Sequence, residues 1–269
     1  KKIVIRGARV VSPGVDLARA DVRLEDGRIA EVSERPLAME GADVVEAEGR
    51  ILAPGFIDIH THGRSGKDFC DLTDEAFDVM GRDRLKDGVT GFLATGLTRP
   101  EEDLAELCRC VERYKRRTVQ PSTSNVRRST CLGVHLEGPF FNPTMAGAQN
   151  PAFLKKPDLG MVERLHAISP VKKVSFAPEL EGAEDFVRGL RKLGIVASGD
   201  WSVATAAKNE NIIVMRTFSK SYSLAGLRVG YCVGPKDLIG ALYKIKDSYN
   251  VDAIAQTLAL AAVRDQKTL

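Results

Sequence analysis

Between residues 51 and 200 the chain alternates short apolar runs with amphipathic stretches, and this rhythm constrains the fold more than any other feature. The stretches predict helices over 73–87, 101–117, 158–168 and 183–193. The apolar runs are ILAPGFIDIH, VTGFLATGL, TCLGVHLEGPF, VKKVSFAPE and IVASGD. Strands that alternate with helices predict parallel βα units. Polar residues gather at the C-terminal ends of these runs, which favours a (βα) barrel of the TIM type.

The segments on either side of this region have different patterns. DVRLEDGRIAEV turns at Asp26 and Gly27, which predicts a β-hairpin within residues 1–50. Beyond residue 200 the rhythm breaks, although NIIVMRTFS and LRVGYCVG predict strands and two helical stretches follow them. The Ala/Asn/Lys-rich stretch 204–211 is the best candidate for a boundary. We expect an α/β protein with a small β domain over 1–50, a partial (βα) barrel over 51–200 and a separate segment over 201–269.

Composition excludes several classes of protein. The net charge is +3 over 269 residues, and no dense Lys/Arg run indicates a nucleic-acid partner. No apolar run approaches the roughly 18 residues of a membrane span, and KKIVIRGARVV alternates like a strand rather than a signal peptide. The five cysteines lack metal-finger spacing, so reduced thiols in a cytoplasmic protein are the simple expectation.

The run DIHTHG carries the first group of residues with a chemical signature. His60 and His62 are two positions apart, and on a strand this spacing points both imidazoles to one face. Imidazole suits Zn, Fe and Co, and Glu137 at the end of the third run can supply a carboxylate. A bound metal would lower the pKa of water and polarise a carbonyl. Two exposed strand-end histidines, and Glu137 as the partner of a helix N-terminus, are the structural alternatives.

Other polar residues of this region have simpler interpretations. His135 is expected either to point away from the ligand direction of Glu137 or to pack beneath it. Glu179 in APEL fits a structural carboxylate at a strand end better than it fits a ligand. His166 lies within a predicted helix and is expected to be structural.

The run RTFSKSYSLAGLRVGY carries the second group. A pyridoxal phosphate enzyme needs a lysine that holds the cofactor covalently, and a hydroxyl and an arginine that neutralise its phosphate. Lys220, Ser219 and Arg228 meet these needs, and Gly226 allows the tight backbone between them. A solvated lysine meets the bare pattern equally well, so the pattern alone does not decide.

Longer motifs resemble known families. VVEAEGRILAPGFIDIHTHG resembles the amidohydrolase superfamily, and GVHLEGPFFNPTMAGAQNP narrows the resemblance to N-acetylglucosamine-6-phosphate deacetylases. SFAPEL fits the same family, so the resemblance covers about residues 1–199. It implies a metal-dependent hydrolase of amino sugar metabolism that releases acetate from an amino-sugar phosphate. Its divalent metal, Zn, Fe or Co, would lie at His60, His62 and Glu137.

The same resemblance implies a substrate site and a defect. Ala148, Gln149 and Asn150 would lie near the sugar phosphate. The family follows IVASG with a histidine, whereas Asp200 follows here, and further metal and catalytic residues come from later strands of the family. About three of eight barrel strands would be missing, which implies a truncated and impaired enzyme. An open sheet would expose its edges and an apolar face.

NIIVMRTFSKSYSLAGLRVGYCVGPKDLIGAL is similar to fold-type I aminotransferases, and most of all to histidinol-phosphate aminotransferases of histidine biosynthesis. This resemblance covers about residues 205–269 and implies an αβ fragment of the large domain. Lys220 would be the Schiff-base lysine, and Ser219 and Arg228 would hold the phosphate of pyridoxal phosphate. Most other cofactor and substrate groups of that family lie outside this segment.

Three functional hypotheses follow from two unrelated enzyme pieces joined near residues 199–207. The chain is an impaired deacetylase, a histidinol-phosphate aminotransferase-like enzyme, or an inactive chimeric or misassembled product. The expected partner is a small phosphorylated substrate, with no nucleic acid and no membrane. Both resembled families commonly form dimers, so the resemblance implies that a homodimer is possible.

Overall fold

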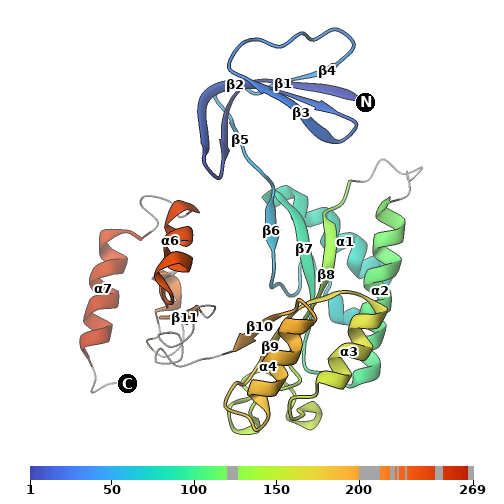
Figure 1. Ribbon diagram of the computed structural model, residues 1–269, viewed down its shortest axis with the longest axis vertical. Coiled ribbons are helices and arrows are strands. Elements are labelled where there is room, and N and C mark those ends of the chain that lie inside the picture. Colours follow the sequence, from blue (N-terminus) through green and yellow to red (C-terminus); the bar gives the residue numbers. More distant parts are fainter. Residues whose placement is uncertain are drawn as a thin grey trace. The chain divides into compact units, whose positions relative to one another are not determined.

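The computed structural model describes residues 1–119, 127–199, 213–218, 222, 224–227, 229–245 and 251–265 (Figure 1). Gly55–Ser202 form one compact unit, and the segments before and after it are described by themselves. Within the described ranges, no helix combines the length and the apolar character that crossing a membrane requires. The predicted domain boundaries stay a prediction.

The N-terminal segment forms a five-stranded sheet in which three strands are antiparallel and two short ones run parallel to β1. Its strands are β1 (Lys2–Ser12), β2 (Val15–Glu25), β3 (Arg28–Ser33), β4 (Asp43–Glu46) and β5 (Ile51–Leu52). The predicted hairpin joins β2 and β3, where Asp26 and Gly27 both adopt positive φ, at 49° and 79°. Two consecutive residues in this conformation make the tight turn whose twist matches that of the strands. Small and branched residues such as Ala8 and Val22 form the core of this sheet.

The compact unit is built on a second five-stranded sheet with the order β10-β9-β8-β7-β6. Its strands are β6 (Phe56–Asp58), β7 (Val89–Gly96), β8 (Thr130–Glu137), β9 (Val171–Phe176) and β10 (Val196–Gly199). Every neighbouring pair is parallel, as the alternating pattern predicts. Neighbours in the sheet are also neighbours in the chain, so the arrangement fits part of a TIM-type barrel.

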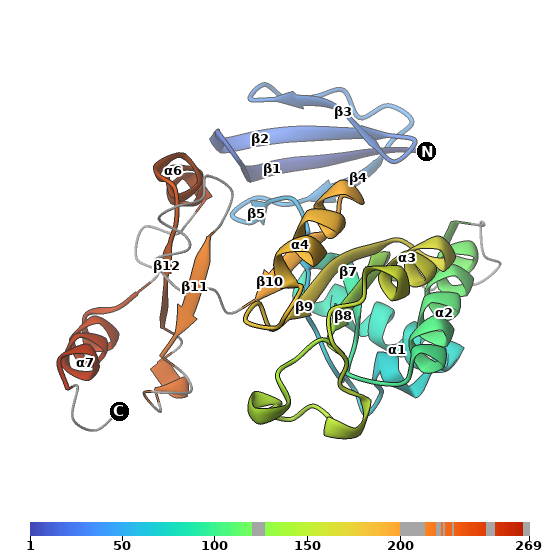
Figure 2. The same ribbon diagram turned by 60° about the horizontal axis from the view of Figure 1, so that its bottom comes forward.

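Helices connect these strands and bury one face of the sheet (Figures 1 and 2). They are α1 (Asp74–Arg84), α2 (Glu101–Val119), α3 (Leu159–Ile168) and α4 (Ala183–Lys192), and the 3-10 turn η2 (Leu85–Asp87) extends α1. The side chains of Thr73 and Asp158 cap α1 and α3 by accepting from backbone N–H groups. A buried aromatic cluster that includes Phe77, Phe92 and Tyr114 packs between helices and sheet.

The edges of the parallel sheet carry exposed apolar side chains. Phe56 on the edge strand β6 is 69% exposed, and Val196 on the opposite edge strand β10 is 61% exposed. A protein core normally covers residues of this size.

The C-terminal segment contains the predicted strands and helices. β11 (Val214–Thr217) pairs antiparallel with β12 (Gly230–Val233), and η5 (Ala225–Leu227) precedes β12. α6 (Lys236–Ile245) and α7 (Ala253–Arg264) follow, and Phe218 packs in a small cluster with residues of α7. The predicted cofactor residues Ser219, Lys220 and Arg228 lie outside the described residues, as does the predicted boundary at 204–211.

Candidate metal centre

His60 and His62 lie in the loop that follows β6, and the prediction that they lie on the strand is wrong. β6 ends at Asp58, whose carboxylate accepts a hydrogen bond of 3.2 Å from the backbone N–H of His60. An aspartate that bonds the backbone two residues ahead competes with the strand ladder and favours a turn. The loop carries both imidazoles beyond the end of the strand.

Both imidazoles nevertheless meet the carboxylate of Glu137, which is the last residue of β8. Nε2 of His62 lies 2.9 Å from Oε2 of Glu137, and Nε2 of His60 lies 3.9 Å from Oε1. The two rings are 5.0 Å apart and stand at 89° to each other. One ligand atom from each of the three residues lies within 4.8 Å of the other two. Among the described residues, no other group of three such side chains converges in this way.

A third histidine packs beneath this group. His135 is fully buried, and its Nδ1 lies 3.2 Å from Nδ1 of His60, while its Nε2 lies 2.9 Å from Oγ of Ser175. Burial lowers the pKa of His135 to about 3, helped by the nearby charge of Lys173, so its ring is neutral. Burial also lowers the pKa of His60. The ring nitrogens of His135 contact His60, Thr95 and Ser175.

Thr61, between the two histidines, anchors their loop to the body of the unit. Its backbone N–H donates to Oγ1 of Thr95 on β7 at 3.1 Å, and its own Oγ1 accepts from Nη2 of Arg84 at 2.6 Å. Arg84 is only 2% exposed, and its guanidinium lies over the rings of Phe69 and Phe92, 5.4 Å from each centroid. Burial lowers the pKa of Arg84. The buried cation therefore fixes the loop through one short hydrogen bond and two aromatic faces.

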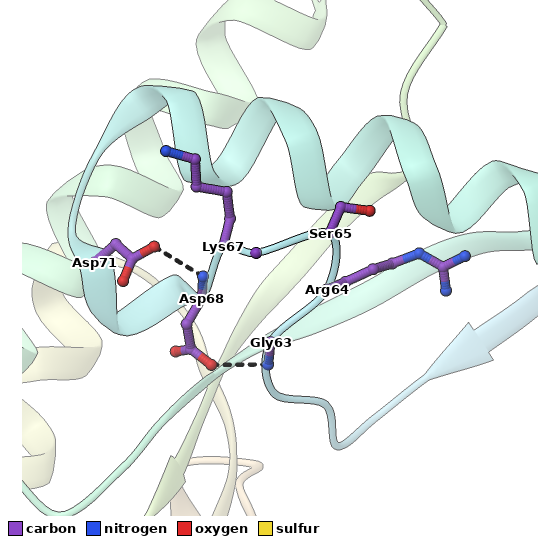
Figure 3. A pocket seen from close by; sticks show the side chains of 7 residues that line it. Gly63, Arg64, Ser65, Lys67, Asp68 and Asp71 are labelled. Carbon is purple, nitrogen blue, oxygen red and sulfur yellow. Dashed lines mark hydrogen bonds between the residues drawn. The ribbon is translucent and has the colours of Figure 1, made fainter.

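The chain after His62 forms a tight turn around an open hollow of about 330 Å³ (Figure 3). The residues that line it are Gly63, Arg64, Ser65, Gly66, Lys67, Asp68 and Asp71. Asp68 accepts from the N–H of Gly63 at 2.8 Å, and Asp71 accepts from the N–H of Asp68 at 2.9 Å. The two basic side chains are paired, Arg64 with Asp87 and Lys67 with Glu75. These contacts fix the turn, and the pairing neutralises its positive charges.

The residues expected near a sugar phosphate lie in the loop between η3 (Pro143–Met145) and η4 (Pro151–Phe153). Oε1 of Gln149 accepts from the N–H of Thr98 at 2.9 Å, and Oγ1 of Thr98 donates to the carbonyl of Glu137 at 3.4 Å. Thr98 thus links Gln149 to the end of β8. Ala148 is exposed, and Asn150 caps η4 through its Oδ1. Their role in substrate binding stays a prediction.

The sequence pattern did not indicate Thr95 and Ser175, and it gave His135 no partners. These three residues come from three neighbouring strands, and nothing in a single run of sequence marks them as a group. One signal was present, because His135 and Glu137 are two apart on one strand and so share a face. Glu179 lies apart from the three donors and accepts from Asn142 at 3.0 Å. His166 lies on α3, as expected of a structural residue.

The donor set fits a divalent metal. Two imidazole nitrogens and a carboxylate oxygen are the ligands that Zn and the neighbouring transition metals take, and His₂–carboxylate sets leave a position open for water or substrate. Each of the three side chains is partly exposed, so an ion and a small molecule can reach the donors from solvent.

Most of the chain is similar to deacetylases, both among curated proteins and among solved structures. The N-acetylglucosamine-6-phosphate deacetylase of Lysinibacillus sphaericus is 31% identical over 205 residues, which are 76% of this chain and 51% of that protein. The crystal structure of N-acetylglucosamine-6-phosphate deacetylase from Thermotoga maritima is 31% identical with a TM-score of 0.58, covering 73% of this chain and 48% of that one. The chain spans about half the length of the curated deacetylases it matches.

The C-terminal part matches a different family. The family model of the class I and II aminotransferases matches the sequence over residues 184–269. Histidinol-phosphate aminotransferase 1 of a Nostoc species is 60% identical over 58 residues, which are 22% of this chain and 16% of that protein. The predicted resemblance of the chain to two enzyme families is therefore confirmed. The aminotransferase match begins within α4 and includes β10, which pairs with β9 in the parallel sheet.

Proposed function

We propose that His60, His62 and Glu137 bind a divalent metal ion and that the chain acts, weakly, as a deacetylase of an amino-sugar phosphate. One observation carries the proposal: donor atoms from two segments converge at the C-terminal ends of two parallel strands. Catalytic groups gather at this end of a βα barrel. The deacetylases that match most of the chain support the choice of reaction.

The protein would contribute the negative charge of Glu137 and the fixed positions of the two histidines. When bound, the metal would supply a polarised amide carbonyl and a water molecule of lowered pKa. Glu137 offsets part of the positive charge of the cation, and the rigid end of β8 fixes its carboxylate. Thr61, held by Thr95 and Arg84, keeps His60 and His62 at a fixed distance from that carboxylate.

Metal binding and turnover place different demands on the chain. Binding needs the three donors, which the structure brings together. Turnover also needs a group that accepts a proton from water, and the family resemblance assigns this task to an aspartate from later strands. Among the described residues, Glu137 is the one carboxylate of the donor group. Its carboxylate would bind the cation and so would not be free to accept a proton. We therefore expect metal binding with slow turnover.

The substrate we propose is an N-acetylated amino-sugar phosphate. Its phosphate would lie at the loop of Ala148, Gln149 and Asn150, next to the end of β8. The amide nitrogen of Gln149 is a donor suited to a phosphate oxygen, and its Oε1 is already bonded to Thr98. This bond orients the amide, so that the donor end points away from Thr98.

Acetate release tests the proposal. The purified chain of residues 1–269, supplied in turn with Zn²⁺, Fe²⁺ or Co²⁺, is incubated with N-acetylglucosamine 6-phosphate, and acetate is measured by a coupled assay. We expect slow release that Glu137→Gln abolishes and that the matched variant Glu179→Gln leaves unchanged. Release that is absent with every metal, or equal in the wild type and Glu137→Gln, would contradict the proposal.

The aminotransferase matches favour a second candidate, attachment of pyridoxal phosphate at Lys220. The 60% identity over 58 residues supports it. Ser219 and Arg228 would hold the phosphate of the cofactor, and all three residues lie outside the described part of the chain. A visible absorption band that appears with added cofactor and disappears in Lys220→Ala would support attachment. An unchanged spectrum would leave the third hypothesis, an inactive product, for this segment.

A further inference from the structure

The two ring nitrogens of His60 face different partners. Nε2 faces the carboxylate of Glu137, at 3.9 Å from Oε1, and Nδ1 faces Nδ1 of His135 at 3.2 Å. A neutral imidazole carries one proton, so one ring nitrogen is a donor and the other offers a lone pair. The proton position on His60 therefore decides whether Nε2 is free to bind a cation.

Two proton arrangements satisfy the contact between His60 and His135. In the first, Nδ1–H of His60 donates to Nδ1 of His135, whose Nε2–H donates to Oγ of Ser175. In the second, the directions reverse: Ser175 donates to His135, His135 donates to His60, and His60 carries its proton on Nε2.

A metal bound at Nε2 of His60 requires the first arrangement, since only then does Nε2 offer a lone pair. Thr95 accepts the backbone N–H of Thr61, so its own hydroxyl proton needs another acceptor, and Nδ1 of His135 lies 3.4 Å from its Oγ1. That nitrogen offers one lone pair in the first arrangement, so the Thr95 hydroxyl would share it with Nδ1–H of His60. In the second arrangement, Nε2–H of His60 would face solvent and the metal position, because 3.9 Å to Glu137 is too long for a hydrogen bond and the His60 side chain is 43% exposed.

We propose that His135 is a positioning residue that, with Ser175, holds His60 in its Nδ1–H form and leaves Nε2 free for the metal. This inference rests on the proposed metal site. A histidine that binds a metal usually donates its second N–H to a carboxylate, a carbonyl or water, and here a buried neutral histidine takes that place. His62 differs, because its Nδ1 is buried without a hydrogen-bond partner. His135 therefore acts on one of the two histidine ligands.

Nitrogen NMR of the metal-free chain tests the proton position directly. The chain has four histidines, so ¹⁵N-histidine labelling and single substitutions assign every ring. We expect the Nδ1–H form of His60 in the wild type and in His135→Asn, whose amide oxygen offers an acceptor near the same place. His135→Leu should shift His60 towards the Nε2–H form. An Nε2–H form in the wild type, or a proton position unmoved by His135→Leu, would overturn the inference.

Metal affinity gives a second readout, measured by Zn²⁺ competition against a fluorescent chelator. Loss of a hydrogen-bond partner behind a ligand typically weakens binding by about 10–100-fold. We expect that loss in His135→Leu, a smaller loss in Ser175→Ala, and affinity within a few fold of wild type in His135→Asn. His166→Leu, on the remote helix α3, is the control and should match the wild type.

The outcomes distinguish a failure of the positioning role of His135 from a failure of the proposed metal site. Equal affinity in the wild type, His135→Leu and Ser175→Ala would overturn the positioning role while the metal site stands. A wild type that binds no metal would overturn the proposed function, and the NMR experiment would still decide the proton position. If His135→Leu does not fold, Ser175→Ala compared with the wild type carries both tests, since it removes the partner that orients His135.

Discussion

The carboxylate of Glu137 lies 2.9 Å from Nε2 of His62, although the two residues are 75 positions apart in the chain. Residues that converge over such a distance in the chain form the site only in the folded unit. A ligand that binds the folded chain alone stabilises it, by about 2.7 kcal/mol at a concentration 100 times its Kd. We expect Zn²⁺ to raise the Tm of the wild type and EDTA to reverse the rise.

Substitution of the carboxylate tests this linkage between metal and fold. Glu137→Gln should lose most of the rise in Tm with Zn²⁺, because a neutral amide lacks the negative charge with which a carboxylate binds the cation. Glu179→Gln should keep the full rise, since Glu179 bonds Asn142 outside the donor group. Thermal melts with and without metal give the comparison. An equal rise in wild type and Glu137→Gln would place the bound metal elsewhere.

The buried guanidinium of Arg84 is predicted to matter for stability. Arg84→Ala removes the hydrogen bond to Thr61, the contacts with Phe69 and Phe92, and most of a buried side chain. Truncations of buried side chains of this size cost about 2–5 kcal/mol. Urea unfolding should show a loss in this range, whereas Arg188→Ala, on the exposed face of α4, should change stability by less than about 0.5 kcal/mol. Equal losses in both variants would contradict this role.

Gly81 and Tyr114 form a tightly packed pair that a double-mutant cycle can test. A Cβ at Gly81 would lie 2.0 Å from the hydroxyl of Tyr114, which donates a buried hydrogen bond of 2.7 Å to the carbonyl of Ser129. Overpacking of this kind typically costs about 1–3 kcal/mol. We expect Gly81→Ala to be destabilising in the wild type and clearly less so in Tyr114→Phe, which removes the closest atom. Equal costs in the two backgrounds, measured by urea unfolding, would show that the helix shifts instead.

Asp83 is predicted to make the stability of the unit depend on pH. The hydroxyl of Ser65 donates to its carboxylate at 2.6 Å, and Arg82 and Lys86 also contact it, so its pKa lies well below the ordinary value. A carboxyl whose pKa is lower in the folded chain stabilises the fold above its unfolded pKa of about 3.9. This contribution is lost as the pH falls from there towards the folded pKa.

Unfolding at pH values between about 2 and 7 tests this dependence. The wild type should lose stability below about pH 4, and Asp83→Asn should lose less over the same range. Ser65→Ala, which removes the largest cause of the shift, should lie between them. Identical slopes in the wild type and Asp83→Asn would show that Asp83 does not contribute.

Local signals in the sequence predicted most elements of the compact unit. Thr73 and Asp158 stand at the starts of two helices. Threonine and aspartate are residue types that accept hydrogen bonds from the free N–H groups of a first helical turn, so the sequence itself indicates these starts. The prediction that His60 and His62 lie on a strand was wrong, because the side chain of Asp58 bonds the backbone of His60 and β6 ends at Asp58. The role of His135 depends on Thr95 and Ser175, which only the parallel register of β7, β8 and β9 brings beside it.

The most direct test of the account is the metal content of the chain after equilibrium dialysis against Zn²⁺. We expect about one tightly bound ion per wild-type chain and none at this affinity in the combined variant His60→Ala, His62→Ala, Glu137→Ala. Circular dichroism would verify that the variant keeps its secondary structure. Equal metal content in the wild type and the folded triple variant would contradict the central claim that these three side chains form a metal centre.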